Sequence, residues 1–261
     1  MKRKQFYSNL KQFEKILLGN STSLQSFLFH SEGYIEGIRR SISEIEKYCK
    51  REANILDFGC GTGFLSTCLA SLAFHVYGID TEVNNPEMIQ EFRKKRGVQA
   101  KIWKTLENDN LKFYFYNGIN LPFDNKSFDS IIAHAVIEHI PIENLDLLLK
   151  QIYRVLKDKG YFLIFRTPRK QAYAECIARI LHLGSHKVLV DEHKLLFKLK
   201  KNDFKIISIK RTDLFFWSLP GKFQYLWNFL SPALLIIDQI LLKTSLNYFA
   251  HNIQIVCGRF D

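Results

Sequence analysis

Three glycines at every second position follow an aspartate near residue 60. The segment Asp57 to Gly63, DFGCGTG, stands between the apolar run NIL and the helix-like run FLSTCLASL. Glycine lets the main chain bend tightly, and it lets a ligand approach the main chain where a Cβ atom would otherwise stand. The segment therefore predicts a strand, a tight turn and a helix that form part of a ligand site.

A second carboxylate, Asp80, ends the strand-like run HVYGID about twenty residues after the glycines. A carboxylate at this place can accept hydrogen bonds from both hydroxyl groups of a ribose. Together with the glycine turn it indicates a βαβ unit that binds a nucleoside. A dinucleotide site would have its glycines as G-x-G-x-x-G, whereas this chain has G-x-G-x-G, so the spacing disfavours NAD.

Histidines farther along the chain could do acid–base chemistry. His139, with Glu138 beside it, is the first candidate for the base that a weakly acidic hydroxyl or an ammonium group would need in order to react. His134 and His193 are weaker candidates for the same role. The alternative interpretation is that Glu138 and His139 only shape the loop into the next helix.

The elements that must position these residues alternate between strand-like and helix-like segments. Five short apolar runs, NILDFG, HVYGID, KFYFYN, SFDSIIAH and GYFLIF, end in turn residues and are separated by helix-like stretches. This alternation predicts a parallel, doubly wound α/β sheet. Because parallel strands are usually covered on both faces, we expect the aromatic run KFYFYN to be buried on both faces. Residues 1–50 instead have the spacing of helices.

The chain after Pro168 is less regular. We expect helices over 171–184 and 193–201, a strand at FKIISIKR and a closing strand at NIQIVCGRF. Between Leu214 and Asp261 only five residues are Lys, Arg, Asp or Glu while ten are aromatic. Such a segment either closes the core or presents apolar surface to a ligand or a membrane. The sequence thus divides into an amino-terminal helical part (1–50), a core (51–168) and a carboxyl-terminal part with an acceptor-facing lid (169–261).

Composition narrows the class of protein further. The 261 residues, 47% of them hydrophobic and with a net charge of +11, can form a sizeable folded core, and the charge by itself does not select a partner. The five cysteines form no C-x-x-C pair, which favours a reduced, cytoplasmic protein. We see no secretion signal, and the apolar run 233–242 is interrupted by Asp238 and Gln239, so we expect no transmembrane helix.

These segments resemble the class I S-adenosylmethionine-dependent methyltransferases. The motif D-x-G-x-G-x-G followed by G-I-D is the strongest match, and the blocks LPF, SFD, VIEHI and YRVLK with Gly160 follow in the order typical of that family. The resemblance extends over 53–168 and more loosely over 193–209, and it includes methyltransferases of type 11 and of ubiquinone biosynthesis. It implies a Rossmann-like, seven-stranded, mostly parallel sheet and S-adenosylmethionine as the cofactor.

Site residues follow from the resemblance position by position. It implies that the main chain around Gly59 and Gly61 holds the methionine part of the cofactor, that Asp57 supports this loop and reaches the ammonium group, and that Asp80 binds the ribose. Asn117 stands where the family often has an aspartate that meets adenine, and an amide oxygen can still accept that hydrogen bond. The full predicted cofactor set is Arg39, Asp57, Gly59, Gly61, Gly63, Asp80, Asn117, Gly118 and His134.

The predicted activity is methyl transfer, most plausibly to oxygen, on a small lipophilic or carrier-linked acceptor, with possible peripheral contact to a membrane. Related ubiquinone-pathway enzymes carry E-x-x-E-H for a metal, but this chain has Ala135 at the first acidic position, so we expect no metal. One alternative is a methyltransferase for RNA such as tRNA, suggested by the basic charge. Another is a non-catalytic partner subunit that only binds the cofactor. The oligomeric state stays open.

Overall fold

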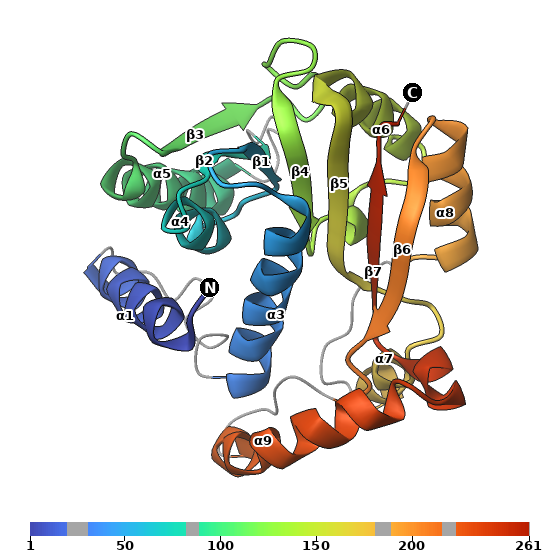
Figure 1. Ribbon diagram of the computed structural model, residues 1–261. Helices are drawn as coiled ribbons and strands as arrows, with labels where there is room; N and C mark the ends of the chain where they lie inside the picture. Colours follow the sequence, from blue (N-terminus) through green and yellow to red (C-terminus); the bar gives the residue numbers. More distant parts are fainter. Residues whose placement is uncertain (20–30, 82–88, 181–188, 216–222, 261) are drawn as a thin grey trace.

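A seven-stranded sheet with helices on both faces forms the centre of the described part of the chain (Figure 1). The structure is a computed structural model that describes residues 1–19, 31–81, 89–180, 189–215 and 223–260. Within those residues the strand order is β3-β2-β1-β4-β5-β7-β6. All neighbouring pairs are parallel except those that involve β7, which is antiparallel to both β5 and β6. The predicted doubly wound, mostly parallel sheet is confirmed.

The strands are β1 (Asn54–Phe58), β2 (His75–Thr81), β3 (Leu111–Tyr116), β4 (Phe128–His134), β5 (Leu156–Pro168), β6 (Lys205–Thr212) and β7 (Asn252–Gly258). The helices are α1 (Arg3–Gly19), α3 (Glu32–Tyr48), α4 (Phe64–Ala70), α5 (Ile89–Leu106), α6 (Leu145–Val155), α7 (Tyr173–Ile180), α8 (Glu192–Lys201) and α9 (Phe223–Leu241), with two short 3-10 helices, η2 (Ile137–His139) and η3 (Ser245–Phe249).

Strand β1 is the point at which the strand order reverses. It lies between β2 and β4, with Leu56 opposite Tyr77 on one side and Ile131 on the other. From β1 the chain first moves outward to β2 and β3, and then returns to β4 on the opposite side. In sheets of this kind, ligands bind outside the carboxyl ends of the strands at this switch point. The glycine turn begins directly after β1 and therefore lies there.

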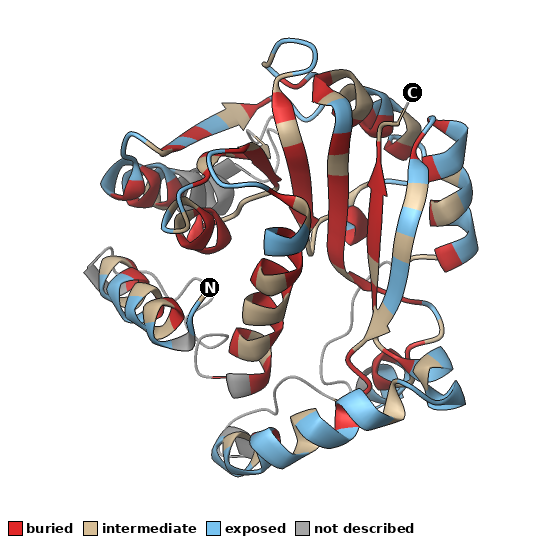
Figure 2. Cartoon of the chain, viewed as in Figure 1, coloured by how far each residue is buried: buried red, intermediate tan, exposed pale blue. Residues whose placement is uncertain are grey.

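Two hydrophobic clusters cover the two faces of the sheet, and alternate strand residues face each of them. Ile55 packs in the cluster formed with α1, α3, α4 and α5, whereas its neighbour Leu56 packs in the cluster formed with α6 and α8. The helices of residues 1–50 belong to the first cluster, where Phe6 and Ile42 are fully buried. Figure 2 shows the buried residues concentrated along the strands and on the helix faces toward them.

The expectation that the aromatic third strand is buried on both faces was wrong. Strand β3 is the outer strand and pairs only with β2. Phe113 and Tyr116 are buried, but Lys112 and Tyr114 are exposed. The physical reason is that an outer strand has a neighbouring strand on one side only. The Tyr114 ring contacts the rings of Tyr77 and Phe123 but stays exposed.

The carboxyl-terminal part adds two strands and three helices to this framework. The strands expected at FKIISIKR and NIQIVCGRF are β6 and β7, and the helix expected over 193–201 is α8. The helix expected over 171–184 is α7, and residues 181–184 lie outside the described residues. Helix α9 is inserted between β6 and β7, and it lies at the carboxyl edge of the parallel strands, close to α7 (Figure 1).

Candidate functional site

The glycine turn after β1 has backbone torsions that ordinary residues rarely adopt. Gly59 and Gly61 have φ of +74° and +55°, in the left-handed region. A Cβ atom on Gly59 would lie 2.5 Å from a methyl group of Val136, in the loop after β4. A Cβ on Gly61 would meet no heavy atom of the described residues within 4 Å. The turn thus packs against the β4 loop at Gly59 and leaves space beside the Cα of Gly61.

Asp57, in strand β1, links the start of this turn to the helix that follows it. Its side chain is buried, and its Oδ2 atom accepts a hydrogen bond from the Ser66 hydroxyl in α4 at 2.5 Å. Burial raises the pKa of Asp57 to about 6, and the nearby Asp80 carboxylate raises it further while the Ser66 hydrogen bond lowers it. A cation placed next to this carboxyl would stabilise its charged form. The predicted supporting role of Asp57 is therefore consistent with its contacts.

Asp80 lies at the end of β2 and is joined to the glycine turn. The main-chain N–H of Gly61 donates to Asp80 Oδ2 over 3.2 Å, and the N–H of Thr81 donates to Oδ1 over 2.7 Å. A carboxylate offers about four acceptor sites in all, so a ribose hydroxyl can join the donors that already contact Asp80. Asp57, Asp80 and the glycine turn, which the sequence placed about twenty residues apart, form one site.

Two residues of α5 that the sequence did not single out also contact this site. Gln99 donates to the carbonyl oxygen of Gly61 and to Asp80 Oδ2, at 2.5 and 3.1 Å. Trp103 donates its indole N–H to the same Gly61 oxygen at 3.0 Å. Four residues apart, the two side chains share one face of the helix. That spacing was the only sequence signal, and it does not reveal which element the face contacts.

The remaining predicted cofactor residues lie around this centre with contacts of their own. Asn117 is exposed, and its amide oxygen accepts from the main-chain N–H groups of Ile119 and Asn120, so the turn already uses the atom expected to meet adenine. Gly118 lies closest to Thr81 at the end of β2. Arg39 in α3 forms an ion pair with Glu36 one turn earlier, at 2.6 Å. Contact of these residues with a cofactor stays a prediction.

His134 ends β4 beside the glycine turn. Its neighbour Ala133 pairs with Phe58, the last residue of β1. Its Nε2 atom is buried with no hydrogen-bond partner among the described residues. Burial and the guanidinium of Arg166 lower the pKa of His134 to about 3, so the ring is neutral at physiological pH. A neutral imidazole with a buried nitrogen can hydrogen-bond to a ligand at the end of β4.

The two predicted catalytic residues of η2 differ in their surroundings. Glu138 is buried, whereas His139 is exposed. Both follow Val136, the residue that packs against Gly59. Among the described residues no group of three or more metal-ligating side chains is present. Whether His139 acts as a base stays a prediction.

Fold and site together define a class of protein: a Rossmann-like domain with a nucleoside site at its switch point. Comparison with known proteins names the family more narrowly. Residues 56–164 match the methyltransferase domain family. The chain is 28% identical over 172 residues to the ubiquinone biosynthesis O-methyltransferase of Pelagibacter ubique. The matched region covers 62% of this chain and 65% of that protein. It is 31% identical over 143 residues to the enzyme of the same name from Rickettsia canadensis, covering 54% and 52%.

Solved structures share the fold. The chain is similar to a S-adenosylmethionine-dependent methyltransferase of Methanosarcina mazei, with a TM-score of 0.54, 19% identity and coverage of 83% of this chain and 97% of that one. It is also similar to phosphoethanolamine N-methyltransferase 2 of Haemonchus contortus, solved with S-adenosylmethionine, with a TM-score of 0.58, 17% identity and coverage of 85% and 53%. At these identities the likeness shows the fold alone.

Residues 56–164 thus match a methyltransferase domain, and the chain has the fold of the class I S-adenosylmethionine-dependent methyltransferases, whose cofactor is S-adenosylmethionine. The site fits this cofactor, because space is open beside the Cα of Gly61 and two carboxyl groups suit a ligand that carries positive charge. The chain spans between half and two thirds of the length of the two curated relatives. Its acceptor therefore does not follow from theirs.

Proposed function

We propose that this protein transfers the methyl group of S-adenosylmethionine to an oxygen atom of a small, lipophilic or carrier-linked acceptor at the surface of a membrane. The observation that supports this acceptor class most directly is helix α9. It lies at the carboxyl edge of the sheet, the same edge as the glycine turn, and most of its large apolar side chains are exposed.

The sulfonium of the cofactor supplies an electrophilic methyl group, so the protein's main contribution to the rate is position. Holding the reacting atoms in line can lower the barrier by about 7–11 kcal/mol. The glycine turn and Asp80 would hold the cofactor. For a hydroxyl acceptor, we propose His139 as the base, assisted by Glu138, because the loop that carries both residues packs on Gly59 through Val136.

Helix α9 exposes many apolar side chains and buries some polar ones. Ser231 and Asp238 are buried, whereas Gln239 is exposed. Tyr225 and Phe229 are each 81% exposed. Further exposed apolar side chains on this helix are Leu226, Leu230, Ile236, Ile237 and Ile240. Because a helix in water normally turns its apolar face to the core, this arrangement favours an apolar environment outside the protein.

The exposed apolar surface continues beyond α9. Leu246, Tyr248 and Phe249 of η3 are also exposed, and η3 follows α9 directly (Figure 2). None of the described helices has the length and apolarity to cross a bilayer. A helix that lies in the interface, drawn to anionic lipids by the net charge of +11, accounts for both facts. We propose a cytoplasmic protein that contacts the membrane peripherally.

Sedimentation with vesicles tests the membrane contact. The double variant Tyr225→Glu/Phe229→Glu should lose most of the binding of the full chain to vesicles that contain phosphatidylglycerol, because two charges then face the acyl region. Phe197→Glu is the matched control, since Phe197 is 67% exposed on α8, away from α9. Unchanged sedimentation of the double variant, or equal loss in the control, contradicts the proposal.

Labelled cofactor tests the acceptor class. The protein is incubated with S-adenosylmethionine that carries a tritiated methyl group and with either a total lipid extract or tRNA. We expect label in the organic phase and none in RNA. Label that enters tRNA and is released by RNase contradicts a lipophilic acceptor. Treatment of the labelled lipid with mild alkali identifies the accepting oxygen, because a methyl ester releases its label as methanol and a methyl ether keeps it.

A further inference from the structure

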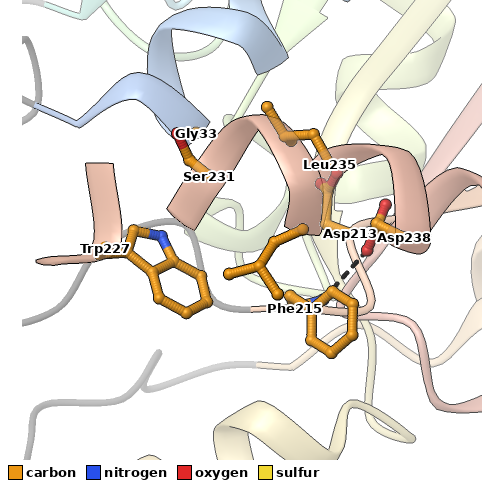
Figure 3. A pocket seen from close by; sticks show the side chains of 8 residues that line it. Gly33, Asp213, Phe215, Trp227, Ser231, Leu235 and Asp238 are labelled. Carbon is orange, nitrogen blue, oxygen red and sulfur yellow. Dashed lines mark hydrogen bonds between the residues drawn. The ribbon is translucent and has the colours of Figure 1, made fainter. Parts of the chain in front are cut away.

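A small pocket lies between α3 and α9, beyond the end of β6 (Figure 3). Two carboxyl groups, Asp213 and Asp238, stand on one side of it, and the other walls are aromatic and aliphatic. The residues that line it are Gly33, Asp213, Phe215, Trp227, Ser231, Leu234, Leu235 and Asp238. The pocket shares the carboxyl edge of the sheet with the cofactor site but contains none of the residues of that site.

Asp238 has one oxygen in use and one without a partner. Its Oδ1 atom accepts hydrogen bonds from the main-chain N–H groups of Leu214 and Phe215, at 2.7 and 3.1 Å. Its Oδ2 atom is buried and has no hydrogen-bond partner among the described residues, although the residue is only 3% exposed. An acceptor that is buried and unsatisfied costs free energy until a donor reaches it.

Asp213 adds a second carboxyl to the same pocket. It is buried, and its Oδ2 atom accepts from Asn252 and Thr212, at 2.6 and 3.0 Å. Arg166 stabilises its charged form, and Arg40 does the same for Asp238. Burial nevertheless raises the pKa of both carboxyl groups above the ordinary value, so these guanidinium groups offset only part of the desolvation. A cation bound in the pocket would therefore stabilise the charged forms of both Asp213 and Asp238.

Aromatic walls indicate what kind of positive charge fits. The ring of Phe215 lies beside the carboxyl groups, whereas Trp227 lines the opposite side of the pocket, and an aromatic ring attracts an organic cation through its face. A divalent metal would need more oxygen ligands than two carboxyl groups and a serine hydroxyl supply. No metal-ligating group of three or more occurs among the described residues.

We propose that this pocket binds a small alkylammonium group. Its N–H groups or methyl groups would lie between Asp213 and Asp238 and against the ring of Phe215. The ammonium belongs either to the methyl acceptor, at a distance from the reacting atom, or to the headgroup of a lipid on which α9 rests. This choice of source rests on the proposed function, whereas ammonium binding itself does not.

Ligand-observed magnetic resonance on the full chain tests the pocket. Methylammonium is titrated at constant ionic strength, and saturation transfer to its methyl protons is followed. We expect saturable binding in the millimolar range that weakens at least tenfold in Asp238→Asn. This variant keeps an amide oxygen for the N–H groups of Leu214 and Phe215. Asp203→Asn, at an exposed turn before β6, should bind like the wild type.

The unfolding temperature of Asp238→Asn shows whether the variant is folded, and a second variant replaces it if it is not. Asp238→Asn should unfold at or above the wild-type temperature, because it removes a buried acceptor that carries unpaired charge. If it does not fold, Phe215→Leu replaces it and should also weaken methylammonium binding, because it removes the ring beside the carboxyl groups. Absence of saturable binding, equal binding by Asp238→Asn and wild type, or displacement of methylammonium by an equal concentration of Na⁺ overturns the proposal.

Vesicles then distinguish the two sources of the ammonium. Binding to vesicles that contain phosphatidylethanolamine, if it depends on Asp238, assigns the pocket to a lipid headgroup. Vesicle binding that is the same in Asp238→Asn, together with Asp238-dependent binding of methylammonium, assigns it to the acceptor. Neither measurement requires methyl transfer, so a protein that binds methylammonium but labels no lipid would contradict the proposed function and leave the pocket standing.

Discussion

The main-chain N–H of Gly61 donates a hydrogen bond to Oδ2 of Asp80 over 3.2 Å, and this bond joins the glycine turn after β1 to the end of β2. Gln99 of α5 donates to the same oxygen over 3.1 Å. The carboxylate expected to bind the ribose is therefore held in place before the cofactor arrives. A group that is already oriented loses less entropy when its ligand binds.

Replacement of Asp80 should weaken cofactor binding. Asp80→Asn keeps the shape of the side chain but removes the charge that strengthens hydrogen bonds from ribose hydroxyls. We expect the dissociation constant for S-adenosylmethionine to rise about 10- to 100-fold, or about 1.4–2.8 kcal/mol. Isothermal titration calorimetry measures it. Asp109→Asn, in the exposed turn before β3, is the control, and equal affinity of the two variants would show that the ribose lies elsewhere.

Gly59→Ala should destabilise the fold and the site together. The added Cβ would stand 2.5 Å from a Val136 methyl group, and the alanine would have to adopt the left-handed φ of Gly59. We expect a loss of about 1–3 kcal/mol in the free energy of unfolding by urea. Gly97→Ala is the matched control, because nothing lies within 4 Å of its Cβ and it sits within α5, where alanine is favoured by about 1 kcal/mol. Similar losses in both variants would refute this account.

The buried carboxyl of Asp57 should make stability fall with rising pH. Folded Asp57 keeps its proton up to about pH 6, whereas its ordinary pKa is 3.8, so the folded state binds more protons between these values. Asp57→Asn lacks this titration. The stability of the wild type minus that of the variant should therefore decrease by about 3 kcal/mol at most from pH 4 to pH 7. Urea unfolding at several pH values measures the difference, and a constant difference contradicts the prediction.

His139→Asn should separate catalysis from binding. If His139 takes the proton of an acceptor hydroxyl, kcat should fall about 10²- to 10⁴-fold, while the dissociation constant for S-adenosylmethionine stays the same. Equal kcat values for variant and wild type would return Glu138 and His139 to a purely structural role.

The buried ion pair between Arg169 and Glu192 should be the costliest of the ion pairs to break. Arg169 is 1% exposed, contacts Glu192 at 2.9 Å and donates to the carbonyl oxygens of Tyr248 and Ala250. Arg169→Met should cost about 1–3 kcal/mol, because two carbonyl groups lose their donor while Arg211 still pairs with Glu192. Lys126→Met breaks the exposed pair with Asp158 and should cost less than about 1 kcal/mol. Chemical unfolding compares them.

The sequence by itself determined the glycine turn, Asp80 and the alternation of strands and helices. These features depend on neighbouring residues: a left-handed torsion needs glycine at its own position, and a buried strand needs a continuous apolar run. The family resemblance depends on the same short segments. For this reason the cofactor end of the site could be predicted with its residues.

Only the tertiary structure decided which faces of the helices and strands contact one another. Local sequence does not reveal that Gln99 and Trp103 contact Gly61, that Glu138 is buried while His139 is exposed, or that β3 is an outer strand. It also does not reveal that α9 buries Asp238 beside Asp213 and exposes its apolar side chains. The physical reason is that the side of an element that becomes buried is set by packing against residues distant in the chain.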